Sequence, residues 1–407
     1  MNKRKLLPLV VLLLPLLMQS CSKDEPDPYA DNTYLVSSSI DMMRTKDNMI
    51  TLISWASLLY PELSGLADEI ESGVNVYSIE YNTSFLGEDI VASGLVIIPS
   101  APGDYPILSF QNGTNTLHSL APTADPDYEP YQLLQCIAST GYVVVVADYL
   151  GFGVTDNMVH PYLHKESTVQ TVIDMLYSVA EFDDDIAKDI TISNDCYLLG
   201  YSQGGWATLA LLEAMDSDYT SDFNVKATCC GAGPYDLGYF NEHVLGLTEY
   251  PMPVFLGYIS NAYCEYDLYA NSLADLFNDP YAGRIPGLYD GLNSSEAINS
   301  QLTVSISGLF NADYISGYAS APAYQGIRDA LSANSIEGWD TSVPLLFVHG
   351  TADTYVFPAL SANMHDEMID AGSSPQSCLY VTLEGLNHSE GIIPALFAGM
   401  EFFKAYR

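Results

Sequence analysis

Short apolar runs alternate along most of the chain with stretches in which apolar residues recur every three or four positions. The apolar runs end in turn residues, as buried strands of a parallel sheet do. They lie within residues 75–81, 90–99, 105–113, 141–153, 196–200, 225–233, 343–350 and 377–385. The helically spaced stretches cover residues 36–70, 130–140, 167–182, 205–215, 357–371 and 391–405. Strand and helix in alternation predict an α/β fold with a mostly parallel central sheet flanked by helices.

Residues 237–340 interrupt this alternation. The interval is rich in Tyr, Asn, Ser and Gly and contains short helical patches, such as NSLADLF at 271–277. We expect it to form a cap inserted over the carboxyl edge of the sheet. The core is then expected to consist of residues 34–236 and 341–407.

The chain begins like an export signal. Three basic residues at positions 3–5 precede an apolar stretch at 6–18, which contains two prolines and is too short to span a bilayer. Cys21 follows directly on a serine, which resembles a bacterial lipobox, where the signal is removed before a cysteine that then carries lipid. Met18 stands where that pattern usually has leucine.

The residues directly after Cys21 resemble the acidic export tag of surface lipoproteins in some Gram-negative bacteria, and the stretch up to residue 33 is rich in Asp and Pro. The sequence therefore predicts a signal peptide at 1–20, lipid on Cys21 and a tether over 21–33. The expected location is the outer membrane of a Gram-negative bacterium, as a surface-exposed lipoprotein held to the membrane by this lipid. Plain secretion with an unmodified Cys21 is the alternative.

The charge of the chain limits the kinds of molecule that can bind to it. Acidic residues number 51 against 13 basic ones, which gives a formal net charge of −38. Such a field repels phosphate backbones, so we expect no nucleic-acid partner. Hydrophobic residues make up 48% of the chain, which is a globular composition. The sequence has neither a CxxC pair nor a His/Cys metal cluster, so we expect no metal and no other cofactor.

One short segment carries a candidate nucleophile. Ser202 lies in GYSQG at 200–204, between the predicted strand at 196–200 and the predicted helix at 205–215. This is the G-x-S-x-G pattern, in which a serine sits on a sharp turn from strand to helix. The turn is so tight that a Cβ atom at either glycine would collide with its neighbours. The helix N-terminus favours developing negative charge, and the backbone N–H of Gln203 is placed to stabilise an oxyanion.

A serine nucleophile needs a base, and the base needs a carboxylate that orients it. In this pattern both follow the serine, each after a strand, in the order serine, acid, histidine. Asp353 follows the strand at 343–350, and His388 follows the strand at 377–385. Both residues therefore stand in the required order at the expected edge of the sheet.

Other residues compete for these roles. Asp236, which follows the strand at 225–233, is the alternative acid, and Asp353 could instead cap the helix that begins near residue 357. His349 ends a strand ahead of the acid and is expected to be structural. His365 lies within a predicted helix.

A second oxyanion donor is expected in the loop after the strand at 105–113. Asn112 and Gly113 are the candidates, and an ordinary turn is the alternative. Asp148 and Tyr149 end another predicted strand. They either shape the substrate pocket or hold their own loop, with backbone amides bonded to Asp148.

Together these segments resemble the α/β-hydrolase superfamily, and more narrowly the secretory lipases and related bacterial serine esterases. The resemblance covers about residues 75–405 and is carried by FQNGT, ADYLGFG, GYSQGG, GAGPYDL, HGTADTYV and GLNHSEG. It implies an α/β-hydrolase fold with an inserted cap. The family often has His-Gly in the oxyanion loop, where this chain has Asn112-Gly113.

The expected activity is that of a serine carboxylic-ester hydrolase that works through an acyl-enzyme. Ser202 is the expected nucleophile, His388 the base and Asp353 the residue that orients the base. Gln203, Asn112 and Gly113 are expected to surround the oxyanion. Lipid acyl chains, short acyl groups and plant-wall aromatic acids all fit the sequence as substrates.

Two alternatives remain open. The paired glycines of GYSQGG also fit a serine peptidase of the prolyl-oligopeptidase type. Those enzymes usually carry a propeller domain before the hydrolase, whereas only 201 residues precede Ser202 here. The other alternative is a non-enzymatic surface lipoprotein that binds glycans on tyrosine platforms, since the chain contains 30 Tyr.

Overall fold

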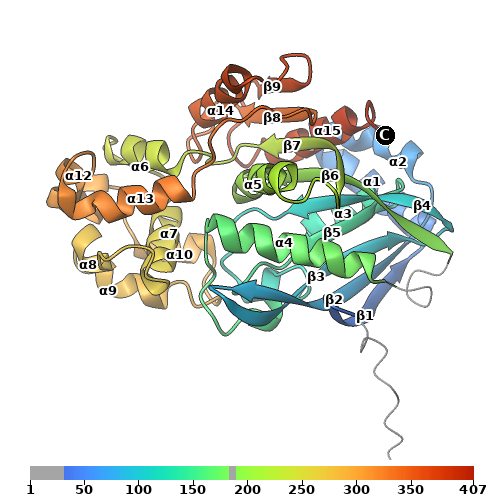
Figure 1. Cartoon of the computed structure of the whole chain (residues 1–407), viewed down its shortest axis with the longest axis horizontal. Helices are drawn as coiled ribbons and strands as arrows, with labels where there is room; N and C mark the ends of the chain where they lie inside the picture. Colours follow the sequence, from blue (N-terminus) through green and yellow to red (C-terminus); the bar gives the residue numbers. More distant parts are fainter. Residues whose placement is uncertain (1–31, 183–188) are drawn as a thin grey trace, which may run out of the picture. The chain divides into compact units, whose positions relative to one another are not determined.

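A nine-stranded sheet runs through the protein, in the order β1-β2-β3-β5-β4-β6-β7-β8-β9 (Figure 1). The structure is a computed structural model that describes residues 32–182 and 189–407. Its strands are β1 (Leu35–Arg44), β2 (Val74–Phe85), β3 (Glu88–Pro99), β4 (Gly103–Gln111), β5 (Val143–Ala147), β6 (Ile190–Tyr201), β7 (Asn224–Gly231), β8 (Leu345–Gly350) and β9 (Cys378–Leu383). The predicted strands within the core are thus all present.

The pairing of neighbouring strands changes once across the sheet, from antiparallel to parallel. The pairs β1–β2, β2–β3 and β3–β5 are antiparallel. The pairs from β5 through β4, β6, β7 and β8 to β9 are parallel. The carboxyl ends of these six strands therefore meet at one edge, which is where open α/β sheets bind ligands. The predicted α/β fold with a mostly parallel sheet is confirmed.

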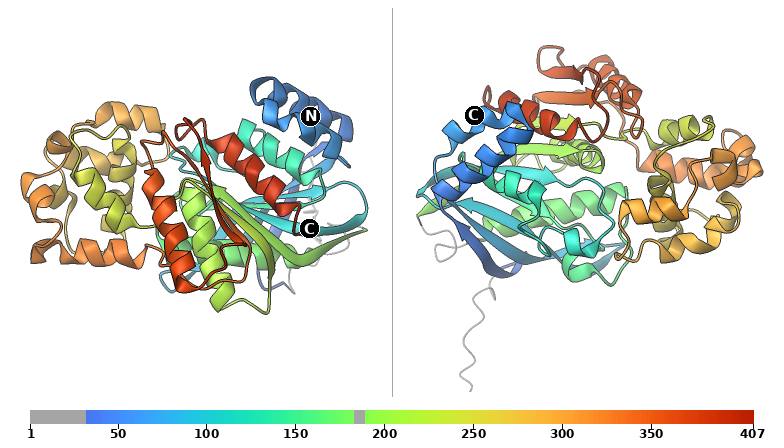
Figure 2. Two further views of the ribbon diagram at one scale, coloured as in Figure 1. Left: turned by 90° about the horizontal axis from the view of Figure 1, so that it is seen from above. Right: turned by 180° about the vertical axis from the view of Figure 1, so that it is seen from behind.

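Helices cover both faces of the sheet (Figure 2). One face carries α3 (Glu129–Ala138) and α15 (Ile392–Phe403), with α1 (Lys46–Leu59) and α2 (Leu66–Glu69) beyond them. The other face carries α4 (Lys165–Ala180), α5 (Gln203–Ser217) and α14 (Pro358–Ala371). Apolar side chains of α1, α3 and α15 join those of the strands in one buried cluster. This burial supplies the main favourable free energy that holds helices and sheet together.

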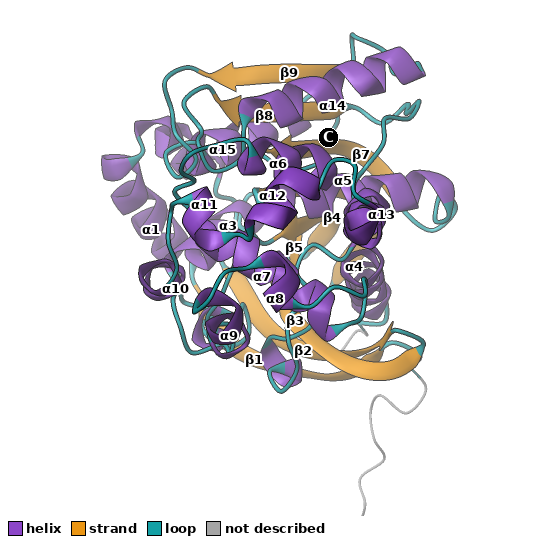
Figure 3. Ribbon diagram, turned by 90° about the vertical axis from the view of Figure 1, so that its left-hand side faces the viewer, coloured by secondary structure: helices purple, strands orange, loops and turns teal. Residues whose placement is uncertain are grey.

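The segment between β7 and β8 forms a group of helices at one end of the sheet (Figure 3). These are α6 (Leu237–Leu245), α7 (Pro253–Glu265), α8 (Leu273–Leu276), α9 (Tyr281–Arg284), α10 (Ser295–Gln301), α11 (Ile306–Leu309), α12 (Ala312–Gly317) and α13 (Gln325–Ala333). None of the nine strands lies within this segment. The helical group coincides with the interval predicted to be a cap, and its exact boundaries stay a prediction.

The prediction of helix from residue 36 onward is wrong for the first ten positions. Residues 35–44 form β1, because their backbone groups pair with β2, for instance Ser39 with Ser78. The helix begins only after Thr45, whose side chain accepts a hydrogen bond from the N–H of Asn48 while the Asn48 side chain accepts from the N–H of Thr45. This reciprocal cap satisfies two free backbone donors and fixes the start of α1.

The N-terminal predictions fall almost entirely outside the described ranges. The signal peptide at 1–20, Cys21 and most of the tether at 21–33 are among them. Thr33, at the end of the predicted tether, lies within the described ranges. Its N–H donates a hydrogen bond to Glu181 Oε1 over 2.8 Å. No helix within the described ranges is long and apolar enough to cross a membrane.

Cysteines in the described ranges carry free thiols. None of the six takes part in a disulfide, and all but Cys264 are buried. Burial raises the pKa of the Cys196 thiol to about 12, which keeps it protonated. These cysteines therefore act as small apolar core residues.

The turn between β6 and α5 is possible only because its glycines lack side chains. A Cβ atom on Gly200 would lie 2.3 Å from the carbonyl oxygen of Gly204. A Cβ atom on Gly204 would lie 1.9 Å from the carbonyl oxygen of Gln111 in β4. Neither contact can be relieved by turning a side chain, because the neighbouring atoms belong to the backbone. The predicted reason for both glycines is confirmed.

We expect Gly204→Ala to destabilise the protein by at least about 1–3 kcal/mol, since an overpacked site must shift its backbone. Gly65→Ala is the matched control, because a Cβ atom there meets nothing within 4 Å and Gly65 already has helical dihedral angles. Urea unfolding of both variants measures the difference. Equal stability of the two variants would contradict the account of this turn.

Candidate active site

Ser202 occupies the turn between β6 and α5 in a backbone conformation that is rare for serine. Its φ is 61° and its ψ is −123°. The surroundings hold it there, since the Ser202 N–H donates to the carbonyl of Gly231 over 2.9 Å, and the Ser202 carbonyl accepts from the N–H of Trp206 over 3.2 Å. A strained residue persists only where such contacts over-determine it. The strain presents the hydroxyl at the carboxyl edge of the sheet.

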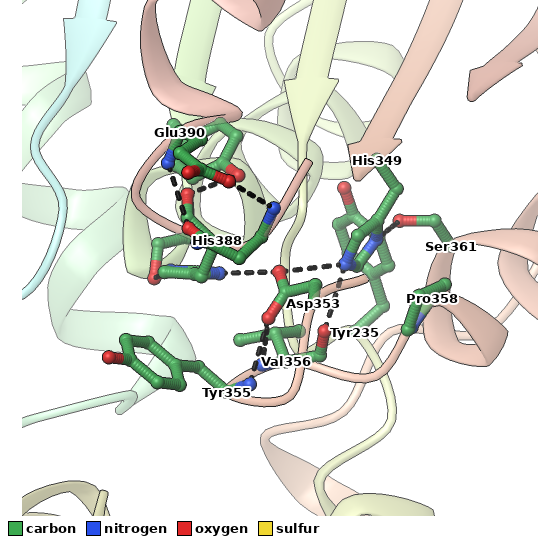
Figure 4. A network of polar contacts seen from close by, with 12 residues as sticks. Tyr235, His349, Asp353, Tyr355, Val356, Pro358, Ser361, His388 and Glu390 are labelled. Carbon is green, nitrogen blue, oxygen red and sulfur yellow. Dashed lines mark hydrogen bonds and ion pairs between the residues drawn. The ribbon is translucent and has the colours of Figure 1, made fainter. Parts of the chain in front are cut away.

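His388 and Asp353 complete a chain of contacts from Ser202. His388 Nε2 lies 2.9 Å from Ser202 Oγ. On the other side of the ring, His388 Nδ1 lies 2.6 Å from Asp353 Oδ2, as Figure 4 shows. The carboxylate can only accept, so Nδ1 carries the proton and Nε2 accepts from the serine hydroxyl. All three residues are buried, with 4–9% of their surfaces exposed. The structure thus brings together the three residues that the sequence selected.

Asp353 is fixed from several sides. Its Oδ1 accepts from the backbone N–H groups of Tyr355 and Val356, over 2.8 and 3.0 Å. Burial by itself raises the pKa of Asp353, but hydrogen bonds from His349 and His388 outweigh burial and hold the pKa at about 2. The carboxylate is therefore ionised at neutral pH and can stabilise a positive charge on His388.

His349 touches this carboxylate, which the sequence did not indicate. His349 Nε2 lies 3.1 Å from Asp353 Oδ2 and 2.9 Å from the carbonyl oxygen of Val356 (Figure 4). Its Nδ1 lies 2.7 Å from Ser361 Oγ. Because Nε2 of His349 faces two acceptors, it carries the proton, and Nδ1 accepts a hydrogen bond from the Ser361 hydroxyl. These contacts fit the prediction that His349 is a structural residue. The group that it holds in place is the carboxylate of Asp353.

The competing residues lie in other settings. Asp236 caps α6, where its Oδ1 accepts from the N–H of Tyr239 over 2.8 Å. His365 lies on α14, with Nδ1 3.1 Å from the exposed carboxylate of Asp366. Neither residue contacts Ser202 or His388 by any hydrogen bond within the described ranges.

The side chain of Gln203 is held by a buried histidine. Gln203 Nε2 lies 3.0 Å from His160 Nε2, while His160 Nδ1 lies 2.7 Å from the carbonyl oxygen of Leu150. The carbonyl requires a proton on Nδ1, so Nε2 accepts from the Gln203 amide. Burial lowers the pKa of His160 to about 4, although the bond to Leu150 opposes the shift, so the ring is neutral. No local pattern predicts this pair, because the two residues are far apart in the chain.

The loop at 112–113 lies beside the serine turn. A Cβ atom on Gly204 would be 2.9 Å from the carbonyl oxygen of Asn112, and one on Gly113 would be 3.4 Å from the carbonyl oxygen of Tyr201. The Asn112 side chain is already engaged, since its Nδ2 donates to the carbonyl of Ala147 over 3.1 Å. The side-chain amide of Asn112 thus fastens the loop, and its contribution to an oxyanion site would have to come from the backbone.

Asp148 holds its surroundings together. It accepts from the Ser93 and Thr123 hydroxyls, each over 2.5 Å, and from the N–H of Thr123 over 2.9 Å. Tyr149 reaches toward the Asn112 carbonyl, with its hydroxyl 3.5 Å away. These contacts fit the prediction that Asp148 has a structural role and bonds backbone amides.

A narrow pocket opens beside Ser202 and Gln203. Most of its lining residues belong to the helical group, and most of these are apolar, among them Leu237, Phe240, Phe255, Leu256, Ile259 and Phe310. Within the described ranges, no group of three or more His, Cys, Asp or Glu side chains is arranged to hold a metal ion. The arrangement therefore places the Ser202 hydroxyl, which lies within hydrogen-bond distance of His388, beside a largely apolar pocket.

Comparison with known families gives one match. The secretory lipase family matches residues 118–271, which include Ser202. No curated protein matches the chain in sequence.

Several solved structures share the fold. A protein of Legionella pneumophila described as a hydrolase is 25% identical, with a TM-score of 0.82, over 92% of this chain and 98% of its own. The rice cell wall degrading esterase LipA of Xanthomonas oryzae is 25% identical, with a TM-score of 0.73, over 91% of this chain and 95% of its own. Lipase A of Candida antarctica, at 14% identity and a TM-score of 0.61, covers 92% of this chain and 82% of its own and shares the fold. The family match and these neighbours show that the chain has an α/β-hydrolase fold and that it resembles the secretory lipases and related bacterial esterases.

Proposed function

We propose that the protein hydrolyses carboxylic esters through an acyl-enzyme on Ser202, with His388 as base and Asp353 as its orienting acid. The observation that carries this proposal is the unbroken chain of contacts from Ser202 Oγ through His388 to Asp353, over 2.9 and 2.6 Å. Serine, base and orienting carboxylate within hydrogen-bond distance are the requirements for an activated serine.

The reaction divides into two halves. Ser202 Oγ attacks the ester carbonyl while its proton passes to His388 Nε2, which then gives that proton to the departing alcohol oxygen. Water next attacks the acyl-enzyme and gives a proton to His388 Nε2. That proton passes to Ser202 Oγ as its bond to the acyl carbon breaks, so the carboxylic acid leaves and Ser202 returns to its starting state. His388 carries positive charge in both halves, and the ionised Asp353 beside Nδ1 stabilises that charge.

The negative oxygen of each tetrahedral intermediate needs donors. The backbone N–H of Gln203 lies at the N-terminus of α5, where the helix dipole favours negative charge. The loop of Asn112 and Gly113 supplies the second donor in this proposal, since it lies beside the turn. The His160 contact keeps the Gln203 side chain in one position while its backbone acts.

Ser202→Ala should abolish ester hydrolysis and leave folding intact, because the hydroxyl is the reacting group and alanine fills less space. The measurement is the rate of 4-nitrophenyl butyrate hydrolysis, with circular dichroism as the check on folding. Ser217→Ala, at the exposed end of α5, is the matched control and should keep the wild-type rate. Full activity in Ser202→Ala would refute the assignment, and cleavage of a Pro-linked peptide instead of the ester would favour the peptidase.

Asp353→Asn should lower kcat by up to the order of 10⁴-fold, since an amide would favour the wrong tautomer of His388 and could not stabilise its charge. Asp236→Asn removes a comparable carboxylate from the cap of α6 and should leave kcat nearly unchanged. Steady-state kinetics on one soluble ester compares them. The assignment fails if Asp236→Asn is the inactive enzyme and Asp353→Asn retains wild-type turnover.

Export and membrane attachment also form part of the proposal. The basic and apolar start of the chain and the lipobox-like setting of Cys21 support it, together with the match to a family named for secretory lipases. The lipid on Cys21 would hold the enzyme at the outer membrane, with the catalytic part on the cell surface.

Cys21→Ser should move the protein from the membrane fraction to the soluble fraction, because the lipid would be its anchor. Ser22→Ala keeps the cysteine and should leave the protein in the membrane fraction. Fractionation and mass spectrometry of the N-terminus measure both. A Cys21→Ser protein that stays in the membrane fraction, or an unmodified Cys21 in the wild type, would overturn the lipoprotein assignment.

A further inference from the structure

Among the polar side chains that line the pocket beside Ser202 and that the catalytic scheme does not use, Asn241 has a buried donor without a partner. Leu237, Phe240 and Asn241 occupy one face of α6, and all three line the pocket. Positions three and four apart share a helix face, so the sequence places an amide next to two apolar side chains. An amide in such a lining fixes the orientation of a ligand more than it adds affinity.

Asn241 Nδ2 is buried and has no hydrogen-bond partner. Two other buried side-chain atoms of the described residues share this state, Tyr81 Oη and Thr228 Oγ1, and both lie within strands of the sheet. Asn241 is the one of the three that lines the pocket. A buried donor without a partner costs about 1–3 kcal/mol, so a ligand that supplies an acceptor recovers that free energy.

The other half of the amide is held in place. Asn241 Oδ1 accepts from the Tyr314 hydroxyl over 3.2 Å. Tyr318 also approaches this amide. Burial raises the pKa of Tyr318 and a hydrogen-bonding interaction with Asn241 opposes that rise, but the contact does not reach hydrogen-bond geometry at Nδ2. The bond from Tyr314 therefore fixes the amide and leaves its N–H groups as the free side.

In the proposed mechanism, this pocket is placed to take the acyl side of the ester. Among the described residues that line it are Ser202, to which the acyl group becomes attached, and Gln203, whose N–H faces the carbonyl oxygen. His388, which gives its proton to the departing alcohol, is not among them. The apolar side chains between Ser202 and Asn241 suit an apolar acyl body, since burying such surface is favourable.

We infer that Asn241 determines acyl specificity by donating a hydrogen bond from Nδ2 to an oxygen in the distal part of the acyl group. This inference rests on the proposed acyl-enzyme mechanism. It names the substrate class as esters whose acyl group is apolar next to the carbonyl and carries an ether, hydroxyl or carbonyl oxygen farther along. Plain acyl groups of equal length bind in the same pocket and leave the amide without a partner.

An oxygen scan of the acyl chain tests this inference. The substrates are 4-nitrophenyl decanoate and the analogues in which one methylene, from position 4 to position 9, is replaced by an ether oxygen. In the wild type, we expect kcat/KM to rise about tenfold over decanoate at one oxygen position, which corresponds to one recovered hydrogen bond. At the other positions kcat/KM should fall, because an ether oxygen buried among apolar side chains loses its hydration.

Asn241→Leu should remove this maximum, so that the variant hydrolyses no ether analogue faster than it hydrolyses plain decanoate, since leucine has nearly the same size but no N–H to donate. Tyr314→Phe is the matched control, because it deletes the bond to Oδ1 and keeps Nδ2. It should retain a maximum at the same oxygen position. A profile without a maximum in the wild type, or one that persists in Asn241→Leu, overturns the inference.

The scan separates this inference from the catalytic proposal. If Ser202→Ala hydrolyses plain decanoate as fast as the wild type, the mechanism on Ser202 is wrong. If decanoate hydrolysis depends on Ser202 but the oxygen profile is flat, the mechanism stands and the role of Asn241 is wrong.

Discussion

The strained backbone of Ser202 is the constraint on which the rest of the site depends. A φ of 61° costs free energy for a residue with a side chain, and the contacts of Gly231 and Trp206 with the Ser202 backbone maintain it. The turn needs glycine at 200 and 204, because two backbone segments pass where side chains would otherwise lie. As a result, the Ser202 hydroxyl lies at the carboxyl edge of the sheet, at the start of α5. Every other catalytic contact is built around that fixed oxygen.

The buried carboxylate of Asp353 is the second element of the site. Two histidines and two backbone N–H groups surround it, so its desolvation is offset by four hydrogen bonds. Those bonds also orient it, because each oxygen has fixed partners. A carboxylate that is held in place and ionised at neutral pH is suited to stabilise a positive charge on His388. The charge of the acid and its rigidity thus come from the same contacts.

The sequence predicted the parts of this structure that local patterns encode. The serine turn was found because glycine spacing, a preceding strand and a following helix are all local, and the triad order followed from the strand count. The contacts of His349 with Asp353 and of His160 with Gln203 could not be predicted, since they depend on side chains meeting in three dimensions. The same holds for Asn241, whose unpaired N–H becomes visible only when all neighbours are placed.

The error at residues 35–44 has a different origin. Apolar positions there can be read with helical spacing, but pairing with β2 offers the backbone a row of hydrogen bonds that a sequence window does not contain. The Thr45 and Asn48 cap, in contrast, is a local signal for the true helix start. These two capping residues predict a helix that begins directly after Thr45, where α1 does begin.

The central claim is that Ser202 forms a covalent bond with substrate, and trapping that bond tests it most directly. The full-length protein would be treated with a fluorophosphonate, digested and analysed by tandem mass spectrometry. The account predicts one phosphonyl group per chain, on Ser202, and none in protein denatured before treatment, since the reactivity depends on His388 and on the strained turn. An adduct on any other residue, or no adduct in an enzyme that hydrolyses esters, would contradict it.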